Sequence, residues 1–191
     1  MSDFSKVDVL ILDDSPSRME ILGQILLGFG ARRLHKTSRS EDAMTAARER
    51  QFDLFIVDNE LAEDRGVEFI RWLRRDATTG NAHAAIIVPS GRASRSEVLR
   101  LRDAGAHCVI GRPLSPETVM SHIKRVVRGD REFVVSDDYV GPDRRFKNEG
   151  PPPGSSGRRA DDKTDELGEQ VGDNLAQTEI DALVKPQKVT L

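Results

Sequence analysis

The sequence predicts an α/β protein: a doubly wound, parallel sheet of five strands with helices on both faces, followed by a largely disordered tail. Five short apolar runs alternate with five segments whose apolar residues recur at helical spacing. Such alternation favours parallel strands joined by right-handed helical crossovers. Beyond residue 128, proline, glycine, serine and charged residues become frequent. A segment of this composition buries too little apolar surface to order itself.

The first strand and helix are expected at the start of the chain. Residues 7–12 form an apolar run that ends at the acidic pair Asp13 and Asp14. Ser15 and Pro16 follow, and they predict a helix start because serine is a common N-cap and proline suits the first helical turn. This segment is therefore predicted to form a strand, an acidic loop and a helix.

The second and third strands are expected at residues 31–37 and 54–57. The second is weakly apolar, and either Ser38 or Ser40 is expected to cap the helix that follows it. The third is apolar throughout, as in a strand buried on both faces, and it stops at Asp58.

The remaining strands are expected at residues 84–88 and 107–110, each followed by a helix. Before the fourth strand, Gly66 opens a helix with one apolar stripe. Ser94 with Glu97 three positions later has the pattern of a capping box. The last helix is expected to end near residue 128, which completes five strand and helix pairs.

Polar and charged side chains follow four of these strands, namely Asp13 with Asp14, Asp58, Ser90 and Arg112. Ligands of open α/β sheets bind in the crevice above the carboxyl ends of the strands. Clustered carboxylates suit Mg²⁺, while a hydroxyl and a cation beside them suit an anion. The set predicts phosphoryl transfer onto a carboxylate, with Asp58 as the acceptor. The alternative is that Asp58 is only a loop or helix-capping residue.

In order and spacing, these motifs resemble the receiver domain of bacterial response regulators, whose fold is flavodoxin-like, over about residues 7–127. The motifs are VLILDDS, LFIVDNELAEDRG, IIVPSG, the DAGA turn and the RP pair after the fifth strand. The resemblance implies that Asp58 is the phosphoacceptor and that Ser90 hydrogen-bonds the phosphoryl group. It also implies that Mg²⁺ is held by three carboxylates and one backbone carbonyl, those of Asp13, Asp14, Asp58 and Glu60.

The sequence departs from the family pattern at three positions. Arg112 stands where the family has lysine, and a planar guanidinium differs in shape from a point ammonium. Val109 stands at the position of the aromatic switch residue, and Ala62 stands at the usual proline. The resemblance implies a cis bond between Arg112 and Pro113. A haloacid-dehalogenase-like phosphatase is disfavoured, because its nucleophile lies in a DxD pattern after the first strand, where this chain has adjacent aspartates.

Composition restricts the function and the setting. The single cysteine, Cys108, can form no intramolecular disulfide, which favours a reducing, intracellular setting. Its apolar surroundings in the sequence indicate a core residue. The sequence shows neither a membrane-spanning apolar segment nor a signal peptide. It also lacks the dense basic stripe of a nucleic-acid-binding domain. We therefore expect a cytoplasmic protein that does not bind DNA.

We expect a receiver domain at residues 7–128 and a linker with an acidic tail, carrying short amphipathic helices, at residues 129–191. The tail holds 9 Lys+Arg and 14 Asp+Glu, whereas the preceding part has a slight basic excess. Residues 175–184, LAQTEIDALV, are similar to the N-terminal segment of the flagellar switch protein. One hypothesis is therefore that the tail occupies the basic face of this receiver or of another one. A disordered, solubilising tail is the alternative.

The resemblance implies a single-domain response regulator that is phosphorylated by a histidine kinase or phosphotransfer protein. It acts by protein binding and not as an enzyme, and its downstream partner is unknown but could belong to the flagellar or chemotaxis system. The alternative is a pseudo-receiver adaptor that is never phosphorylated, which Arg112 favours. Such an adaptor could bind cyclic di-GMP through two arginine pairs of the tail, at residues 144–145 and 158–159.

Overall fold

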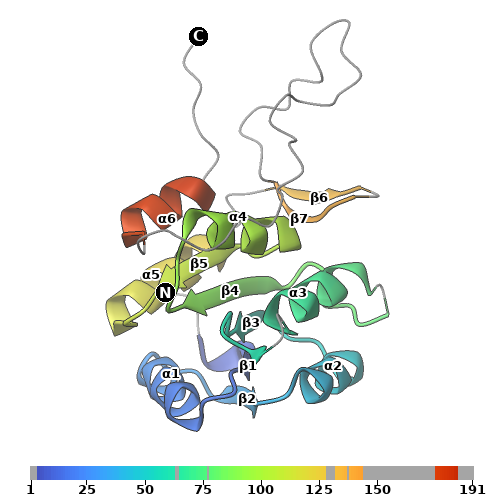
Figure 1. Cartoon of the computed structure of the whole chain (residues 1–191). Helices are drawn as coiled ribbons and strands as arrows, with labels where there is room; N and C mark the ends of the chain where they lie inside the picture. Colours follow the sequence, from blue (N-terminus) through green and yellow to red (C-terminus); the bar gives the residue numbers. More distant parts are fainter. Residues whose placement is uncertain are drawn as a thin grey trace, which may run out of the picture.

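The structure is a computed structural model, and it describes residues 4–62, 65–76, 78–127, 132–136, 138–143 and 175–184. A five-stranded sheet forms its centre, and every neighbouring pair of strands in it is parallel. From edge to edge the strands are β2 (Arg33–Thr37), β1 (Asp8–Leu12), β3 (Leu54–Val57), β4 (Ala85–Ser90) and β5 (Cys108–Gly111). The predicted five-stranded α/β fold is confirmed (Figure 1).

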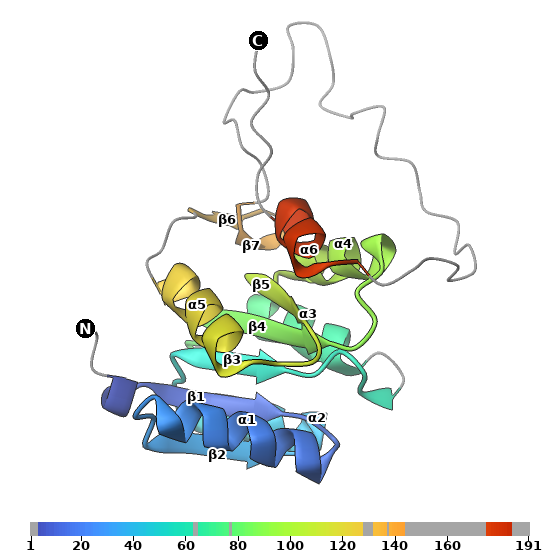
Figure 2. The ribbon, with the colours of Figure 1, turned by 90° about the vertical axis from the view of Figure 1, so that its left-hand side faces the viewer.

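Five helices cover the two faces of this sheet (Figures 1 and 2). They are α1 (Pro16–Gly28), α2 (Ser40–Glu49), α3 (Arg65–Arg75), α4 (Arg95–Ala104) and α5 (Pro116–Val127), and a short 3-10 turn, η1 (Phe4–Lys6), precedes β1. Apolar residues of α1 and α5 share one buried cluster, and those of α2, α3 and α4 share the other. The sheet is therefore doubly wound.

Strand β3 shows how the sequence encodes this arrangement. All four of its residues are buried, with Phe55 and Val57 in one apolar cluster and Leu54 and Ile56 in the other. Side chains of a strand alternate between the two faces, so a continuous apolar run is needed where both faces are covered.

Helix boundaries agree with the predicted caps at two places and differ at a third. Ser15 and Ser94 are N-caps as predicted, and their side chains accept hydrogen bonds from the amides of Arg18 and Glu97 at 3.4 and 3.3 Å. Gly105 ends α4 with a positive φ of 106°. The prediction that Ser38 or Ser40 caps α2 is wrong, because Arg39 is the N-cap and Ser40 is the first helical residue. Arg39 makes no side-chain cap hydrogen bond, so packing of the buried alanines of α2 outweighs the missing cap.

Strand order places a cleft at the centre of the sheet. The chain runs from β1 outward to β2 and then returns to β3 on the other side of β1. This reversal separates the loops after β1 and β3, and ligands of doubly wound sheets bind at such a point. Both predicted acidic loops lie there.

A hairpin of two antiparallel strands, β6 (Phe133–Val135) and β7 (Val140–Pro142), follows the fifth helix and was not predicted. Its Tyr139 is buried, and the Tyr139 hydroxyl donates to the carbonyl of Pro142 at 2.8 Å. The guanidinium of Arg74 in α3 lies 5.2 Å from the ring centroid of Phe133. The hairpin is thus joined to α3 by a cation–π contact.

Helix α6 (Gln177–Val184) lies within the segment of the tail for which short amphipathic helices were predicted. It lies beside α4 and β5 (Figures 1 and 2), and its Ile180 and Val184 are buried. The expected disorder and the two arginine pairs fall on residues 144–174, which lie outside the described residues. None of the helices in the described ranges is long and apolar enough to cross a membrane.

Candidate functional site

Backbone hydrogen bonds past the ends of the strands bring the predicted site residues together. The Asp58 amide donates to the Leu12 carbonyl at 2.8 Å, which extends the β1–β3 ladder and sets Asp58 beside Asp13. The Arg112 amide donates to the Ser90 carbonyl at 2.9 Å, which joins the other two loops.

The three aspartates form one acidic cluster. Carboxylate oxygens of Asp13, Asp14 and Asp58 all lie within 4.8 Å of one another. Asp58 and Asp13 are buried and Asp14 is exposed, so the cluster opens to solvent on the Asp14 side. Three carboxylates this close repel one another and need a cation or a proton between them.

Arg18 supplies positive charge to this cluster, and the sequence analysis did not identify it. Its Nη2 lies 2.6 Å from Asp58 Oδ2, 2.8 Å from Asp14 Oδ1 and 2.9 Å from Asp13 Oδ1. The hydrogen bond with Asp13 raises the pKa of Arg18 above its already high value, so the guanidinium stays charged. Its position four residues after Asp14, in the first turns of α1, was the signal available in the sequence.

Arg112 approaches the cluster from β5. Its Nη2 lies 2.9 Å from Asp58 Oδ1 and 3.3 Å from Asp13 Oδ2, while its Nη1 lies 3.3 Å from Glu60 Oε2. The peptide bond between Arg112 and Pro113 is cis, as expected. A planar guanidinium thus contacts three carboxylates at once, which a single ammonium group could not do with the same geometry.

Ser90 lies at the same edge, but its hydroxyl is engaged locally. Ser90 Oγ donates to the Arg92 carbonyl at 2.8 Å and accepts from the Arg92 amide at 3.2 Å. The side-chain amide of Asn59 also reaches Ser90 Oγ at 3.5 Å, and it donates a short hydrogen bond to Glu97 of α4. The structure therefore places Ser90 at the carboxyl end of β4, next to Asn59, with its hydroxyl bonded to the turn that follows the strand.

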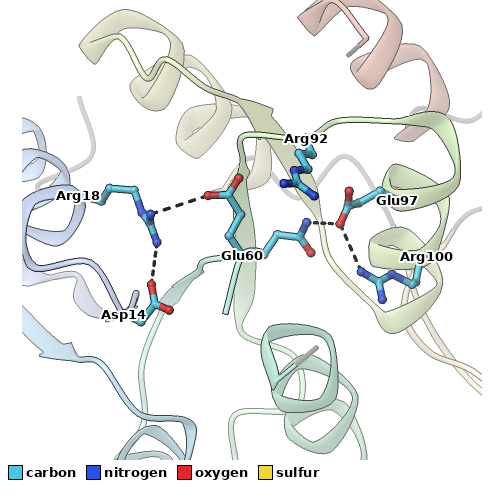
Figure 3. Close-up of a pocket in the computed structure, with 7 residues that line it drawn as sticks. Asp14, Arg18, Glu60, Arg92, Glu97 and Arg100 are labelled. Atoms are coloured by element: carbon cyan, nitrogen blue, oxygen red, sulfur yellow. Dashed lines mark hydrogen bonds and ion pairs between the residues drawn. The ribbon is translucent and has the colours of Figure 1, made fainter. Parts of the chain in front are cut away.

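A polar pocket of about 510 Å³ opens beside the acidic cluster (Figure 3). Its walls are charged and come from the loops after β1, β3 and β4 and from α1 and α4: Asp14, Arg18, Asn59, Glu60, Arg92, Glu97 and Arg100 line it. Three guanidinium groups around one opening suit an anionic group that approaches the carboxylates.

Burial affects the protonation of Asp58, because its side chain is only 1% exposed. Burial raises the pKa of Asp58, Arg112 opposes this effect by lowering it, and Asp13 adds to the rise. A carboxylate with a raised pKa is more basic and hence a better nucleophile than an ordinary aspartate.

The donor set fits a hard divalent cation. Carboxylate oxygens are the ligands that Mg²⁺ prefers, and three converge here. Asp58 Oδ1 is buried and forms no hydrogen bond within the described part of the chain, although the Arg112 guanidinium pairs with its charge. A buried acceptor of this kind is costly unless a further partner reaches it. The same carboxylates are paired with Arg18 Nη2, so a bound cation and this guanidinium would share their ligands.

The fold and the site together define a doubly wound α/β domain with an acidic site at its topological switch point. The family model of the response regulator receiver domain matches residues 9–124. The chain belongs to this family, which serves in two-component signal transduction.

Known relatives agree with this assignment. The chain is 27% identical over 116 residues to the polar-differentiation response regulator DivK of Brucella anthropi and to that of Brucella ovis, and the match covers 61% of this chain and 92% of each relative. The chemotaxis protein CheY4 of Vibrio cholerae has the same fold, with a TM-score of 0.57 at 23% identity over 63% of this chain and 98% of CheY4. A receiver domain of a histidine kinase from Syntrophus aciditrophicus gives a TM-score of 0.57 at 25% identity, over 69% of this chain and 98% of that domain.

Proposed function

We propose that this chain is a single-domain response regulator that accepts a phosphoryl group on Asp58 from a histidine kinase or phosphotransfer protein. An Asp58 carboxylate oxygen attacks phosphorus, the bond between phosphorus and the donor's histidine nitrogen breaks, and the leaving imidazole takes up a proton. The product is an acyl phosphate on Asp58. The reaction changes the chain itself, and we propose no catalytic activity toward other substrates.

The observation that carries this proposal is the environment of Asp58. Its carboxylate is almost fully buried, two guanidinium groups lie within 3 Å of it, and one of these, that of Arg18, lines the polar pocket. Fixed positive charge of this kind stabilises the charge that develops on the equatorial oxygens of a transferring phosphoryl group.

The other site residues have distinct roles in the proposal. Arg112 neutralises phosphoryl oxygens, and Ser90 donates its hydroxyl to one of them after its bond to the Arg92 carbonyl breaks. Mg²⁺ would be held by the carboxylates of Asp13, Asp14 and Asp58 and the carbonyl of Glu60, and it would neutralise charge on the transferring group. Support for this ion comes from the magnesium in the receiver domain of the Pseudomonas aeruginosa sensor kinase PA1611, a fold relative at 18% identity, with a TM-score of 0.56 over 62% of this chain and 95% of that domain. Arg18 must then swing away, and its side chain is 32% exposed, so the space to do so exists.

Phosphate incorporation tests the proposal directly. The chain is incubated with acetyl phosphate and Mg²⁺, and intact mass is measured for the wild type, Asp58→Asn and Arg112→Lys. We expect a gain of one phosphoryl group in the wild type and none in Asp58→Asn. Incorporation that persists in Asp58→Asn would refute the assignment of the acceptor.

A second candidate is a pseudo-receiver adaptor that is never phosphorylated. It is favoured by the guanidinium groups of Arg18 and Arg112, which pair with the same carboxylates that would hold Mg²⁺. In this case the wild type stays unmodified and Arg112→Lys gains a phosphoryl group. The arginine pairs proposed for cyclic di-GMP lie outside the described residues. Calorimetry with cyclic di-GMP at tens of micromolar tests that binding separately.

The proposal includes the domain division and the setting. We assign residues 7–128 to the receiver domain and residues 129–191 to a linker and acidic tail, with the β6–β7 hairpin and α6 as the described parts of that tail. Output is proposed to be protein binding in the cytoplasm. Gel filtration of the phosphorylated and unmodified chain with candidate flagellar proteins tests the partner class.

A further inference from the structure

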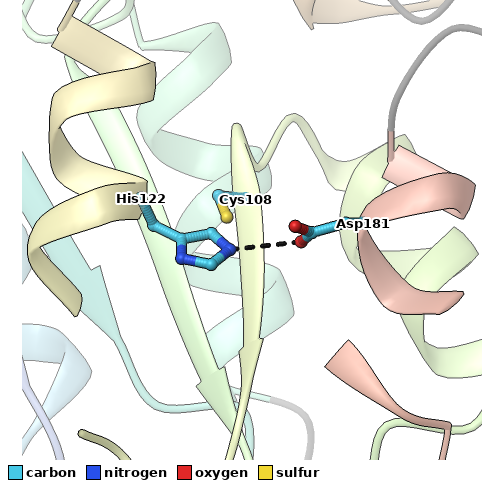
Figure 4. Close-up of side chains that lie close together, drawn as sticks. All are labelled: Cys108, His122 and Asp181. Carbon is cyan, nitrogen blue, oxygen red and sulfur yellow. Dashed lines mark hydrogen bonds and ion pairs between the residues drawn. The ribbon is translucent and has the colours of Figure 1, made fainter. Parts of the chain in front are cut away.

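Three side chains of the types that bind transition metals lie together outside the acidic cluster. They are Cys108 of β5, His122 of α5 and Asp181 of α6, and their ligand atoms all lie within 4.8 Å of one another. Figure 4 shows His122 and Asp181 facing each other beside Cys108. His122 and Asp181 are 59 positions apart in the sequence, so the cluster exists only in the folded chain.

The ring of His122 is oriented so that Nε2 points into this cluster. Its Nδ1 lies 2.8 Å from the carbonyl of Thr118, one turn earlier in α5. A carbonyl can only accept, so Nδ1 carries a proton and donates it there. Nε2 lies 3.1 Å from Asp181 Oδ1. A metal-binding histidine commonly donates its other ring N–H to a backbone carbonyl, and the contact with Thr118 is of this kind.

Arg125 of α5 positions the other two side chains. Its Nη1 lies 2.9 Å from Asp181 Oδ2, and its Nη2 donates to Cys108 Sγ at 3.1 Å. Asp181 thereby keeps Oδ1 on the side of His122. Contacts of this kind orient metal ligands, and the guanidinium offsets part of the negative charge of a metal-bound thiolate and carboxylate.

The cluster is shielded from water on all but one side. Cys108 is completely buried, His122 is 5% exposed and the Asp181 side chain is 19% exposed. An ion therefore reaches the sulfur from the side of Asp181. Once bound, it is held within a largely dry environment, where few water molecules compete with the protein ligands.

The same three residue types form nucleophilic triads in some enzymes, but the geometry here is different. In a triad, one ring nitrogen of the histidine contacts the nucleophile and the other contacts the carboxylate. Here Nδ1 of His122 is bonded to Thr118, and Nε2 faces the Asp181 carboxylate. The sulfur of Cys108 is also out of reach of a substrate, since the residue is completely buried.

We propose that Cys108, His122 and Asp181 bind one Zn²⁺ ion, and that this ion fastens α6 to β5 and α5. Thiolate sulfur, imidazole nitrogen and a carboxylate oxygen are the ligands of zinc sites. The separation of 3.1 Å between His122 Nε2 and Asp181 Oδ1 suits two ligands that each lie about 2 Å from one tetrahedral ion. Three protein ligands leave the fourth position to a water molecule.

Binding exchanges protons for the metal ion. In the metal-free chain Nε2 of His122 shares a proton with Asp181, and Cys108 carries a thiol proton. The ion takes the place of both protons, which are released to solvent. Sulfur and nitrogen ligands disfavour Mg²⁺, which prefers oxygen, so this cluster and the acidic cluster select different ions.

The position of one ligand on α6 gives the ion a structural effect. A helix of eight residues is not stable alone, so α6 depends on its contacts with the rest of the domain. An ion that binds only the folded arrangement stabilises it. Zinc should therefore reduce the opening of α6 away from β5 and α5.

Cobalt spectroscopy tests the site. The full-length, metal-free chain is kept reduced without added thiols and titrated with Co²⁺ in excess Mg²⁺, which occupies the acidic cluster. Cys108 is the single cysteine of the chain, so a sulfur-to-cobalt charge-transfer band can arise from no other residue. We expect this band at one Co²⁺ per chain, and its loss when Zn²⁺ is added, because Zn²⁺ has no geometric preference from its d electrons and accepts a tetrahedral site readily. Absence of the band at saturating Co²⁺ overturns the proposal.

Three variants assign the ligands. Cys108→Ser should lose the band, and Asp181→Ala should bind Co²⁺ at least tenfold more weakly. Asp181 lies at the surface, so its replacement guards against misfolding of the Cys108 variant. His83→Ala, at an exposed histidine, is the control and should bind as the wild type does. Equal affinity of Asp181→Ala and the wild type refutes the part of α6 in the site.

Hydrogen exchange measures the fastening of α6. We expect the amides of residues 180–184 to exchange several-fold more slowly when Zn²⁺ is added to the wild type, and to be unaffected by Zn²⁺ in Cys108→Ser. Unchanged exchange in the zinc-bound wild type refutes the fastening, while the cobalt titration still decides whether the metal site exists. Neither measurement depends on Asp58, so failure of the proposed phosphoryl transfer leaves this test intact.

Discussion

Arg18 Nη2 lies 2.6 Å from Asp58 Oδ2, so a guanidinium from α1 pairs directly with the proposed acceptor. The same nitrogen also contacts Asp14 and Asp13. This relationship makes Arg18 an internal counterion for the acidic cluster. It sets the affinity of the site for any external cation, because both must use the same oxygens.

Replacing Arg18 by methionine should therefore tighten Mg²⁺ binding. Removal of a competing charge from three carboxylates is expected to lower the dissociation constant about tenfold, or ~1.4 kcal/mol. Calorimetric titration with Mg²⁺ measures the change. Arg33→Met is the matched control, since Arg33 pairs with Asp8 on the surface and lies in β2. Equal affinity in the wild type and Arg18→Met would show that Arg18 does not compete.

Gly66, at the start of α3, should not tolerate a side chain. A Cβ at Gly66 would collide with the backbone carbonyl of Asp58, which cannot move without displacing the acceptor. We expect Gly66→Ala to lower the free energy of unfolding by about 1–3 kcal/mol, as overpacking does, and to reduce phosphate incorporation.

Gly28→Ala is the control for this substitution. Gly28 ends α1, and nothing lies within 4 Å of a Cβ built there. Alanine in a helix should raise the free energy of unfolding by ~0.5–1 kcal/mol. Urea unfolding of both variants checks the pair, and similar losses in the two would show that the contact with Asp58 is unimportant.

His122 should remain protonated well above neutral pH. Burial lowers the pKa of His122. The hydrogen bond to Asp181 and the contact with Cys108 together outweigh this effect and raise the pKa to about 10. The pKa of His122 is thus higher in the folded chain than in the unfolded chain, where it is near 6.5. Protonated His122 therefore stabilises the fold, and this contribution is fully present below about pH 6.5. This contribution is lost as the pH rises through about 10.

Proton NMR of the His122 ring provides the measurement. Its chemical shift should stay constant between pH 6 and pH 8.5 in the wild type and should titrate at a lower pH in Asp181→Asn. Titration of the wild-type ring near pH 6.5 would contradict the ion pair.

Much of the fold was accessible from the sequence because its signals are local. A strand buried on both faces must be apolar throughout, as residues 54–57 are, and a carboxylate directly after it must lie at the sheet edge. The convergence of Asp13, Asp14 and Asp58 followed from two such strands. These inferences needed no knowledge of which helix packs where.

The features that were missed depend on tertiary contacts. Strands β6 and β7 have only three residues each. Strand β6 has no buried residue, so its sequence lacks the alternation of apolar and polar residues that would indicate a strand. Ser40 is not the N-cap of α2, because the helix begins at Ser40 itself and not one residue later. The contact of Gln177 with the β5 edge joins residues 66 positions apart, which no local pattern encodes.

The β6–β7 hairpin and α6 have a joint thermodynamic consequence. Both are held against the receiver domain, so docking of α6 fixes the separation between the two ends of residues 144–174. The entropy of loop closure grows only logarithmically, and doubling the length of a loop costs only about 0.6 kcal/mol. Insertion of ten residues between positions 144 and 174 should therefore hardly change how often α6 is docked. The length of this part of the chain can therefore change during evolution while α6 stays docked on α4 and β5.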